Sequence, residues 1–164
     1  MSNEPKPAND ATRLVEINLD EDSIGSNSPE IHHEREVAIF DLLEDNYFDL
    51  ANGKTGPYTL DLSIQDAKLV MHVGRADKAS LMSYALSLTP FRKIVKDYFL
   101  VCESYFEAIK TASPAKIEAI DMGRRGLHDD GSRLLMERLE NKINLDFDTA
   151  RRLFTLICAL HWRG

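Results

Sequence analysis

The chain has 164 residues, of which 43% are hydrophobic and 29% are charged, and its net charge at pH 7 is -7. This length suits one domain with a single core and excludes two full-sized domains, while the apolar content excludes disorder throughout. Charged residues interrupt every apolar run before the roughly 18 residues that a transmembrane helix needs, so no membrane association is expected. Residues 1–10 lack the apolar segment of a secretory signal, and the two cysteines fit a reduced, cytoplasmic protein.

The charge is divided unevenly along the chain. Residues 1–88 carry 7 Lys and Arg against 16 Asp and Glu, whereas residues 89–164 carry 13 against 11. Proteins that bind duplex DNA are usually basic overall, because neutralisation of phosphates supplies much of the affinity. Duplex DNA is therefore not an expected partner, and only the second half is a candidate for a local basic patch.

The first half of the chain is predicted to form strands and one helix. Residues 1–12 lack periodicity and are predicted to be a disordered tail. Apolar residues alternate with polar ones over four segments, as in half-buried strands, and the alternating residues are Val15, Ile17 and Leu19; Tyr58, Leu60, Leu62 and Ile64; Leu69, Met71 and Val73; and Met82, Tyr84, Leu86 and Leu88. Residues 21–27 are expected to be a loop, and Ser28 and Pro29 to start a helix that runs to about residue 46, with Val37 and Phe40 on its apolar face.

The second half is predicted to be helical. Thr89 and Pro90 begin a long helix to about residue 111, whose two apolar sides predict a central position with contacts from two directions. Ser113 and Pro114 begin a shorter helix that ends near Gly123. Two further helices are predicted, with caps at Asp129 or Asp130 and at Asp146 or Asp148, and their buried residues are Leu134, Leu135 and Leu139, then Leu153, Phe154, Ile157, Leu160 and Trp162.

These elements predict an α+β fold. An antiparallel sheet of about four strands, formed by residues 13–88 together with one helix, packs with a mostly helical half formed by residues 89–164. The whole of residues 13–164 is predicted to be a single domain that follows the tail of residues 1–12.

Several segments resemble a known family. They are His33–Arg35, Ser87–Arg92, Val95–Phe99, Ala119–His128, Asp148–Leu156 and Leu160–Arg163. Together they are similar to the uncharacterised protein family 0262 of alphaproteobacteria, over nearly the whole chain after the tail. The resemblance implies a bacterial cytoplasmic origin and supplies no activity and no catalytic residue, so functional residues must be sought from the sequence itself.

An arginine- and glycine-rich segment, residues 123–132, is the first candidate site. Arg124, Arg125 and His128 lie there among three glycines. Guanidinium groups bind phosphate or carboxylate in bidentate fashion, and glycines in a loop let backbone amides approach an anion. The alternative is a helix–helix connection whose arginines pair with Asp121, Asp129 or Asp130. The segment is not a P-loop, because the lysine and the preceding strand are missing.

Other candidates lie in the last predicted helix. Arg151 and Arg152 follow Asp148 by three and four residues, so a salt bridge within the helix is the structural alternative to a binding role. His161 could join His128 only through the fold.

Neither a metal site nor a bound cofactor is predicted. The adjacent His32 and His33 diverge on a helix, and Cys102 and Cys158 are too far apart in sequence for a zinc ribbon. The same cysteines lie in apolar helical patterns, which predicts buried and unreactive thiols. No nucleophile elbow is present either.

Two functional hypotheses follow from different classes. The leading one is a non-enzymatic binding or regulatory module for a protein or RNA partner, based on the missing catalytic motifs and the basic-leaning helical half. The alternative is an enzyme or sensor for a small phosphorylated or carboxylated ligand, in which the arginines hold the anion and a histidine transfers protons. The apolar surplus of the helices is consistent with full burial or with a homodimer, and both stay open.

Overall fold

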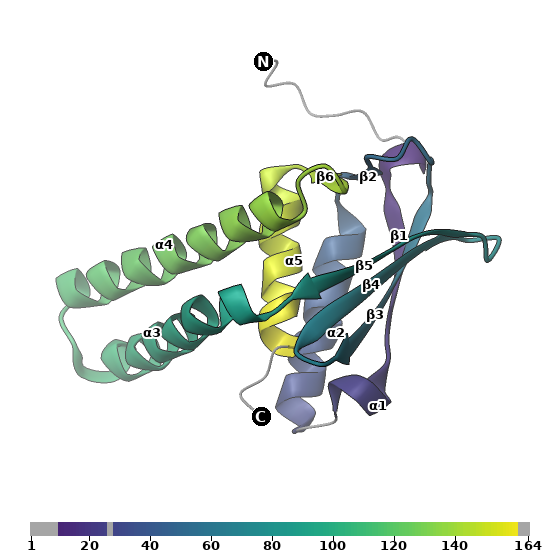
Figure 1. The fold of residues 1–164 in the computed structure, drawn as a ribbon. Coiled ribbons are helices and arrows are strands. Elements are labelled where there is room, and N and C mark those ends of the chain that lie inside the picture. Colours follow the sequence, from purple (N-terminus) through teal and green to yellow (C-terminus); the bar gives the residue numbers. More distant parts are fainter. Residues whose placement is uncertain (1–9, 26–27, 161–164) are drawn as a thin grey trace, which may run out of the picture.

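The computed structural model describes residues 10–25 and 28–160 (Figure 1). The strands are β1 (Leu14–Leu19), β2 (Phe48–Leu50), β3 (Tyr58–Gln65), β4 (Lys68–Arg75), β5 (Ser80–Ser87) and β6 (Ile143–Leu145). The helices are α1 (Glu21–Ile24), α2 (Pro29–Glu44), α3 (Arg92–Thr111), α4 (Pro114–Arg138) and α5 (Phe147–Leu160), and short 3-10 turns span Asp10–Thr12 and Thr89–Phe91. A four-stranded sheet in the first half and long helices in the second confirm the α+β class.

Strands β3, β4 and β5 form the predicted antiparallel meander. Asp66 and Ala67 connect β3 to β4 with φ angles of 53° and 59°, the positive values that a two-residue type I′ turn requires. Leu60 and Leu62 point into the core, while Asp61 between them is exposed. One face of the sheet is therefore buried and the other is solvated, as the alternation predicted.

Strand β1 departs from the expected antiparallel sheet because it pairs with β3 in parallel. The predicted inward position of Val15 is also wrong. A bulge between Leu14 and Glu16 adds one residue to β1, which places Leu14 rather than Val15 in the core and leaves Val15 41% exposed.

A second, two-stranded sheet joins the two halves of the chain. Strand β2 pairs antiparallel with β6, so a strand interrupts the second half that was predicted to be helical. Residues 21–24, predicted to be a loop, form the short helix α1 instead. Of the predicted tail, residues 1–9 lie outside the described residues, and Asp10–Thr12 form a 3-10 turn that receives a hydrogen bond from the Gly56 amide to the Ala11 carbonyl.

Helix α2 begins as predicted, because the Ser28 hydroxyl accepts a hydrogen bond from the Ile31 amide. Its Arg35 is only 3% exposed and donates to the carbonyls of Gly25 and Ala159 at 3.0 Å each. The buried guanidinium thus ties α2 to the end of α5. Val37 and Phe40, predicted on the apolar face, are 44% and 67% exposed.

Helix α4 is one continuous helix of 25 residues, so the predictions of an end near Gly123 and of a cap at Asp129 or Asp130 are wrong. Its start at Ser113 is confirmed, since the Ser113 hydroxyl accepts from the Lys116 amide. The arginine-rich segment is therefore helical surface rather than a loop, and its glycines do not cradle an anion with exposed backbone amides.

Helices α3 and α4 pack against each other as a hairpin that projects away from the sheet (Figure 1). The predicted central position of α3 is wrong, because only Val95 and Ala108 of this helix are buried. Phe106 and Ile109 are 56% and 49% exposed. The hairpin meets the body of the molecule where α4 packs on α5.

Helix α5 is the most deeply buried helix among the described residues. Asp146 caps it, with its carboxylate accepting from the Thr149 amide at 2.9 Å. The predicted apolar residues are buried in it, namely Leu153, Phe154, Ile157 and Leu160, whereas Trp162 lies outside the described residues. None of the helices in residues 10–25 and 28–160 combines the length and the hydropathy that a membrane span requires.

Candidate functional site

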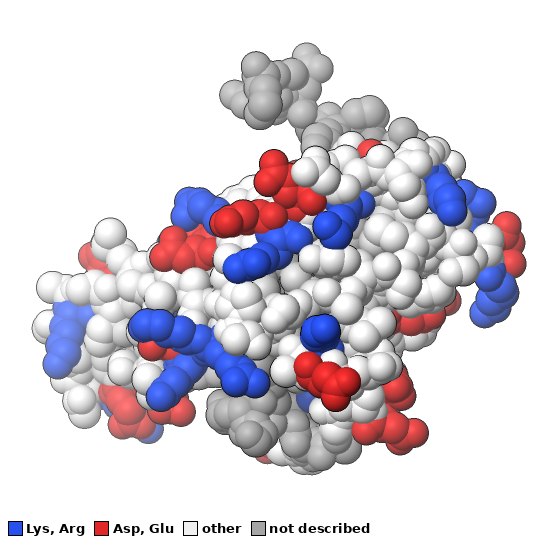
Figure 2. All heavy atoms as spheres, in the orientation of Figure 1, with Lys and Arg blue, Asp and Glu red and all other residues white. Residues whose placement is uncertain are grey.

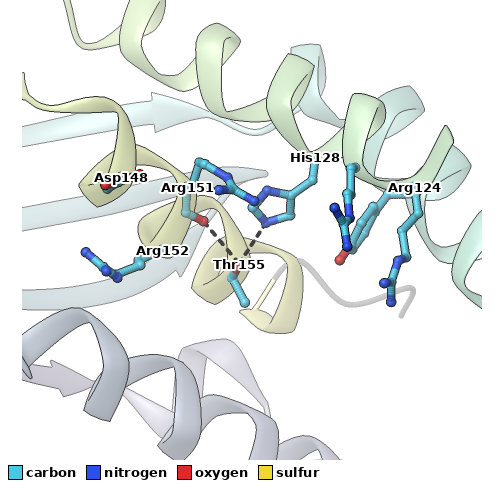
Figure 3. A pocket seen from close by; sticks show the side chains of 8 residues that line it. Arg124, His128, Asp148, Arg151, Arg152 and Thr155 are labelled. Carbon is cyan, nitrogen blue, oxygen red and sulfur yellow. Dashed lines mark hydrogen bonds between the residues drawn. The ribbon is translucent and has the colours of Figure 1, made fainter. Parts of the chain in front are cut away.

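The structure brings five of the six predicted site residues to one cavity of about 380 Å³ (Figure 3). Arg124, Arg125 and His128 come from α4, and Arg151 and Arg152 come from α5. The lining is completed by Tyr98, Asp148 and Thr155. His161, the sixth predicted residue, lies outside the described residues.

Helical spacing explains the convergence. Arg124, Arg125 and His128 lie within little more than one turn of α4, and Asp148, Arg151, Arg152 and Thr155 repeat at three- and four-residue intervals along one face of α5. Because α4 packs directly on α5, the two groups of side chains face a common space. We call this space, with its eight lining residues, the arginine cavity.

His128 lies at the base of the arginine cavity and is only 8% exposed. Its Nε2 atom is 2.8 Å from the Thr155 hydroxyl, which donates its own proton to the Arg151 carbonyl at 3.0 Å. Nε2 must therefore carry the proton that the hydroxyl oxygen accepts. Nδ1 is left as a buried acceptor, with no hydrogen-bond partner among the described residues.

Aromatic rings hold His128 in place. The centroids of the Tyr98 and Phe154 rings lie 5.4 Å and 5.2 Å from that of the imidazole. Burial, and next the positive charge of Arg151, lowers the pKa of His128 from its ordinary value of 6.5. The imidazole is therefore neutral at pH 7. Burial also raises the pKa of the Tyr98 hydroxyl, so this group stays protonated and able to donate.

The arginines are held by carboxylates, as the structural alternative from the sequence predicted. Asp121 pairs with both Arg124 and Arg125, the second at 3.1 Å. The Arg124 guanidinium also lies 4.3 Å from the centre of the Tyr105 ring. These contacts fix the orientation of the two guanidinium groups. The single Asp121 carboxylate is shared between the positive charges of Arg124 and Arg125.

The arginines of α5 are held differently from the expected helical salt bridge. Arg151 pairs with Asp129 of α4 at 3.3 Å, and Arg152 donates to the Asp45 carbonyl at 3.0 Å. Asp148, predicted to cap α5 or to pair with these arginines, lines the cavity. Four guanidinium groups and the Asp148 carboxylate line the cavity, and Asp121 and Asp129 pair with three of these arginines, so the group keeps a net charge of +1 in a chain whose net charge is -7.

This arrangement can hold a small oxyanion. Several guanidinium groups line one space, and the hydroxyl donor of Tyr98 borders it. Among the described residues no cluster of His, Cys, Asp and Glu could hold a metal ion. The chemistry available at the cavity is anion binding together with protonation of His128.

Three cavity residues had not been singled out as site residues. Thr155 continues the three- and four-residue spacing of Asp148, Arg151 and Arg152, so a polar stripe on an otherwise apolar helix was a usable signal. Tyr98 lies in an apolar stripe of α3, and nothing in the sequence separates its hydroxyl from a core position.

The two cysteines do not line the arginine cavity. Both are free, and Cys158 is buried as predicted, whereas Cys102 is only half-buried, so its predicted burial is wrong. Burial raises the pKa of both thiols, so both are protonated at neutral pH. Protonated thiols are weak nucleophiles, which supports the expectation that these cysteines are unreactive.

Comparison with known proteins identifies relatives of the whole chain. A UPF0262 protein of Agrobacterium fabrum is 59% identical over 152 residues, 93% of this chain and 96% of the relative. UPF0262 proteins of Rhodopseudomonas palustris and Xanthobacter autotrophicus are 56% and 58% identical over the full length of both chains. No solved structure matches the chain. The sequence model of the uncharacterised protein family UPF0262 matches residues 11–163, and the chain belongs to this alphaproteobacterial family, which has no assigned activity.

Proposed function

We propose that the protein binds a small anionic ligand, with a phosphate or carboxylate group, in the arginine cavity. The observation that carries the proposal is that four arginines from two helices line one cavity, and that their positive charge exceeds the negative charge of Asp148 in the lining and of the paired Asp121 and Asp129. This combines the non-enzymatic binding module with the ligand class of the second sequence hypothesis. Arg124 and Arg151 hold the anion, and the Tyr98 hydroxyl supplies a further donor.

The surface favours a small ligand over RNA. On the face shown in Figure 2, clusters of Lys and Arg adjoin clusters of Asp and Glu, so this face has no continuous basic track. Nucleic-acid binding sites instead follow a backbone with extended positive charge and stacking aromatic rings. We propose a cytoplasmic location, which the two free cysteines support, because thiols stay reduced in that compartment.

Binding of inorganic phosphate tests the proposal. Phosphate at about a hundred times its Kd is expected to raise the free energy of unfolding by about 2.7 kcal/mol, as measured by chemical denaturation with and without the anion. Arg151→Gln is expected to weaken phosphate binding about tenfold or more, because it removes a charged hydrogen-bond donor that contributes about 1.5–3 kcal/mol.

Arg133→Gln is the matched control. Arg133 lies on the exposed side of α4, pairs with Asp130 at 3.4 Å and does not line the arginine cavity. Its loss is expected to leave phosphate binding unchanged. Equal weakening by the two variants, or no saturable phosphate binding to the wild type, would contradict the proposal.

The affinity for sulfate is expected to rise as the pH falls below 6.5. Sulfate keeps its charge over this range, whereas a bound anion favours the protonated form of His128, whose pKa in the free protein is lowered by burial. Binding then takes up a proton, and the affinity increases by up to about tenfold per pH unit. Isothermal titration at several pH values measures this slope.

The variant His128→Gln is expected to remove that slope, and His72→Gln, on strand β4 away from the cavity, is expected to keep it. The same lowered pKa makes the unfolded chain bind a proton more readily than the folded protein. The free protein therefore loses stability as the pH falls below 6.5. A sulfate affinity that is independent of pH in the wild type would refute the role of His128.

A further inference from the structure

A second cavity, of about 590 Å³, adjoins the arginine cavity. It lies between α2 and α3, with α5 forming its floor. The apolar part of its lining includes Ile31, Val37, Phe99, Cys102, Phe106 and Ala159. We call this cavity the apolar groove.

The two cavities share a wall. Tyr98, Arg124 and Thr155 line both of them, so Arg124 contributes to the positive lining of one cavity and borders the apolar lining of the other. A ligand held at Arg124 by an anionic group is therefore adjacent to the entrance of the apolar groove. The positive lining and the apolar lining therefore form two parts of one continuous surface.

The groove contains apolar side chains that the fold leaves in water. Val37 and Phe106, on opposite walls, are 44% and 56% exposed. Concave apolar surface bordered by a few polar groups is the usual character of a small-molecule site. The polar residues of the groove include the acidic Glu34, Asp41 and Glu103, so a second anionic group is disfavoured there.

We propose that the ligand of this protein is an anionic amphiphile. Its single phosphate or carboxylate lies in the arginine cavity, and an apolar chain attached to that group extends past Arg124 into the apolar groove. This inference rests on the proposed anion-binding function and specifies the ligand class of the same site. The groove is continuous with the arginine cavity, and its acidic residues disfavour a second anionic group. Both features favour an apolar ligand with one anionic end over a second copy of the protein.

Alkyl phosphates of different length test the inference in the full-length protein. The probes are inorganic phosphate, n-butyl phosphate and n-octyl phosphate, the last kept below its micellar concentration, and octyl glucoside serves as the uncharged control. Each buried methylene increases affinity about fourfold. We expect octyl phosphate to bind at least about tenfold more tightly than butyl phosphate, in competition with inorganic phosphate, and octyl glucoside to bind weakly.

Substitutions in the groove test the contribution of the alkyl chain to affinity independently of the contribution of the phosphate group. Phe106→Ser and Val37→Ser are expected to abolish the preference for octyl over butyl phosphate and to leave the affinity for inorganic phosphate unchanged. Both side chains are largely exposed, so the variants are expected to fold. Phe40→Ser is the matched control, because Phe40 is a 67% exposed phenylalanine of α2 that lines neither cavity.

The outcomes distinguish this inference from the function on which it rests. If phosphate binds but octyl phosphate binds no more tightly than butyl phosphate, the inference of an amphiphilic ligand is wrong, and the proposal of anion binding stands. If no anion binds, both fail. Loss of chain-length preference in Phe40→Ser as well as in the groove variants would also overturn the inference, because it would place the chain outside the groove.

Two further arms exclude other occupants. Light scattering that shows a dimer, converted to monomers by Phe106→Ser, would assign the groove to a second copy and overturn the amphiphile. Vesicles that contain phosphatidic acid distinguish a lipid surface from a dissolved ligand. Sedimentation with such vesicles that octyl phosphate does not inhibit would overturn the inference, whereas inhibition by octyl phosphate would support it.

Discussion

Replacement of Phe154 by alanine is expected to lower the free energy of unfolding by about 3–5 kcal/mol, as urea denaturation would measure. The Phe154 side chain has no exposed surface. Its ring lies 6.4 Å from that of Phe91 and 5.2 Å from that of His128, between the core and the arginine cavity. Alanine would leave a cavity that the surrounding helices can fill only in part.

The same substitution is expected to weaken phosphate binding, since Phe154 supports the position of His128. Phe40→Ala is the control, because Phe40 is 67% exposed, and we expect it to change the free energy of unfolding by less than about 0.5 kcal/mol. A loss below about 1 kcal/mol in Phe154→Ala would show that the helices close over the vacated space and that Phe154 is not central to the core.

Replacement of Gly131 by alanine is expected to destabilise the protein by about 1–3 kcal/mol, although alanine is the better helix former. A Cβ atom at position 131 would lie 2.1 Å from Cζ of Phe154. The ring cannot move aside freely, because it is fully buried and packed against Phe91 and His128. Thermal or urea denaturation measures the change.

Gly126→Ala supplies a control in the same helix with the opposite expected sign. No heavy atom lies within 4 Å of a Cβ built there, so alanine is expected to stabilise the protein by about 0.5–1 kcal/mol through helix propensity alone. Combination of Gly131→Ala with Phe154→Leu is expected to cost less than the sum of the two single changes, because the smaller side chain relieves the overlap. Stabilisation by Gly131→Ala would contradict the close contact between α4 and α5.

Local sequence signals predicted much of the fold. Ser28 and Ser113, each followed by proline, mark the starts of α2 and α4, because a hydroxyl cap and a proline at the first helical position act locally. The meander β3–β5 followed from alternation over consecutive segments. Such signals are readable because each depends on only a few neighbouring residues.

The continuity of α4 could not be predicted from these signals. Gly123, Gly126 and Gly131 each cost a helix about 1 kcal/mol relative to alanine and are typical of connections. Packing of α4 against α3 and α5 outweighs that cost. At Gly131 the absence of a side chain is what permits contact with Phe154, so a residue that suggested a break allows the packing.

Partners from distant parts of the chain were also beyond local patterns. Strand β1 pairs in parallel with β3, and strand β2 pairs with β6, which follows it by about a hundred residues in the sequence. Alternation of apolar and polar residues predicts which side chains lie on each face of a strand, but it does not predict which other strand pairs with it. The bulge that turns Val15 outward depends on that pairing as well.

The candidate site was predicted in part. The arginines were recognised by their chemistry, and their convergence depends on the contact between α4 and α5, which the sequence does not show. The two apolar sides of α3 predicted a central helix; in the structure α3 packs on α4, and its Phe99 and Phe106 line the apolar groove. An apolar stripe cannot distinguish a core from a binding surface.

The hydrogen bond between Arg35 and the Ala159 carbonyl has a consequence for folding during synthesis on the ribosome. These two residues are separated by 124 positions, and the same distant region supplies β6 for β2. Because translation proceeds at about 5–20 residues per second, α5 is synthesised on the order of 10 s after α2. During that interval the meander β3–β5 can pair locally, while its apolar face and that of α2 stay exposed to chaperones and proteases.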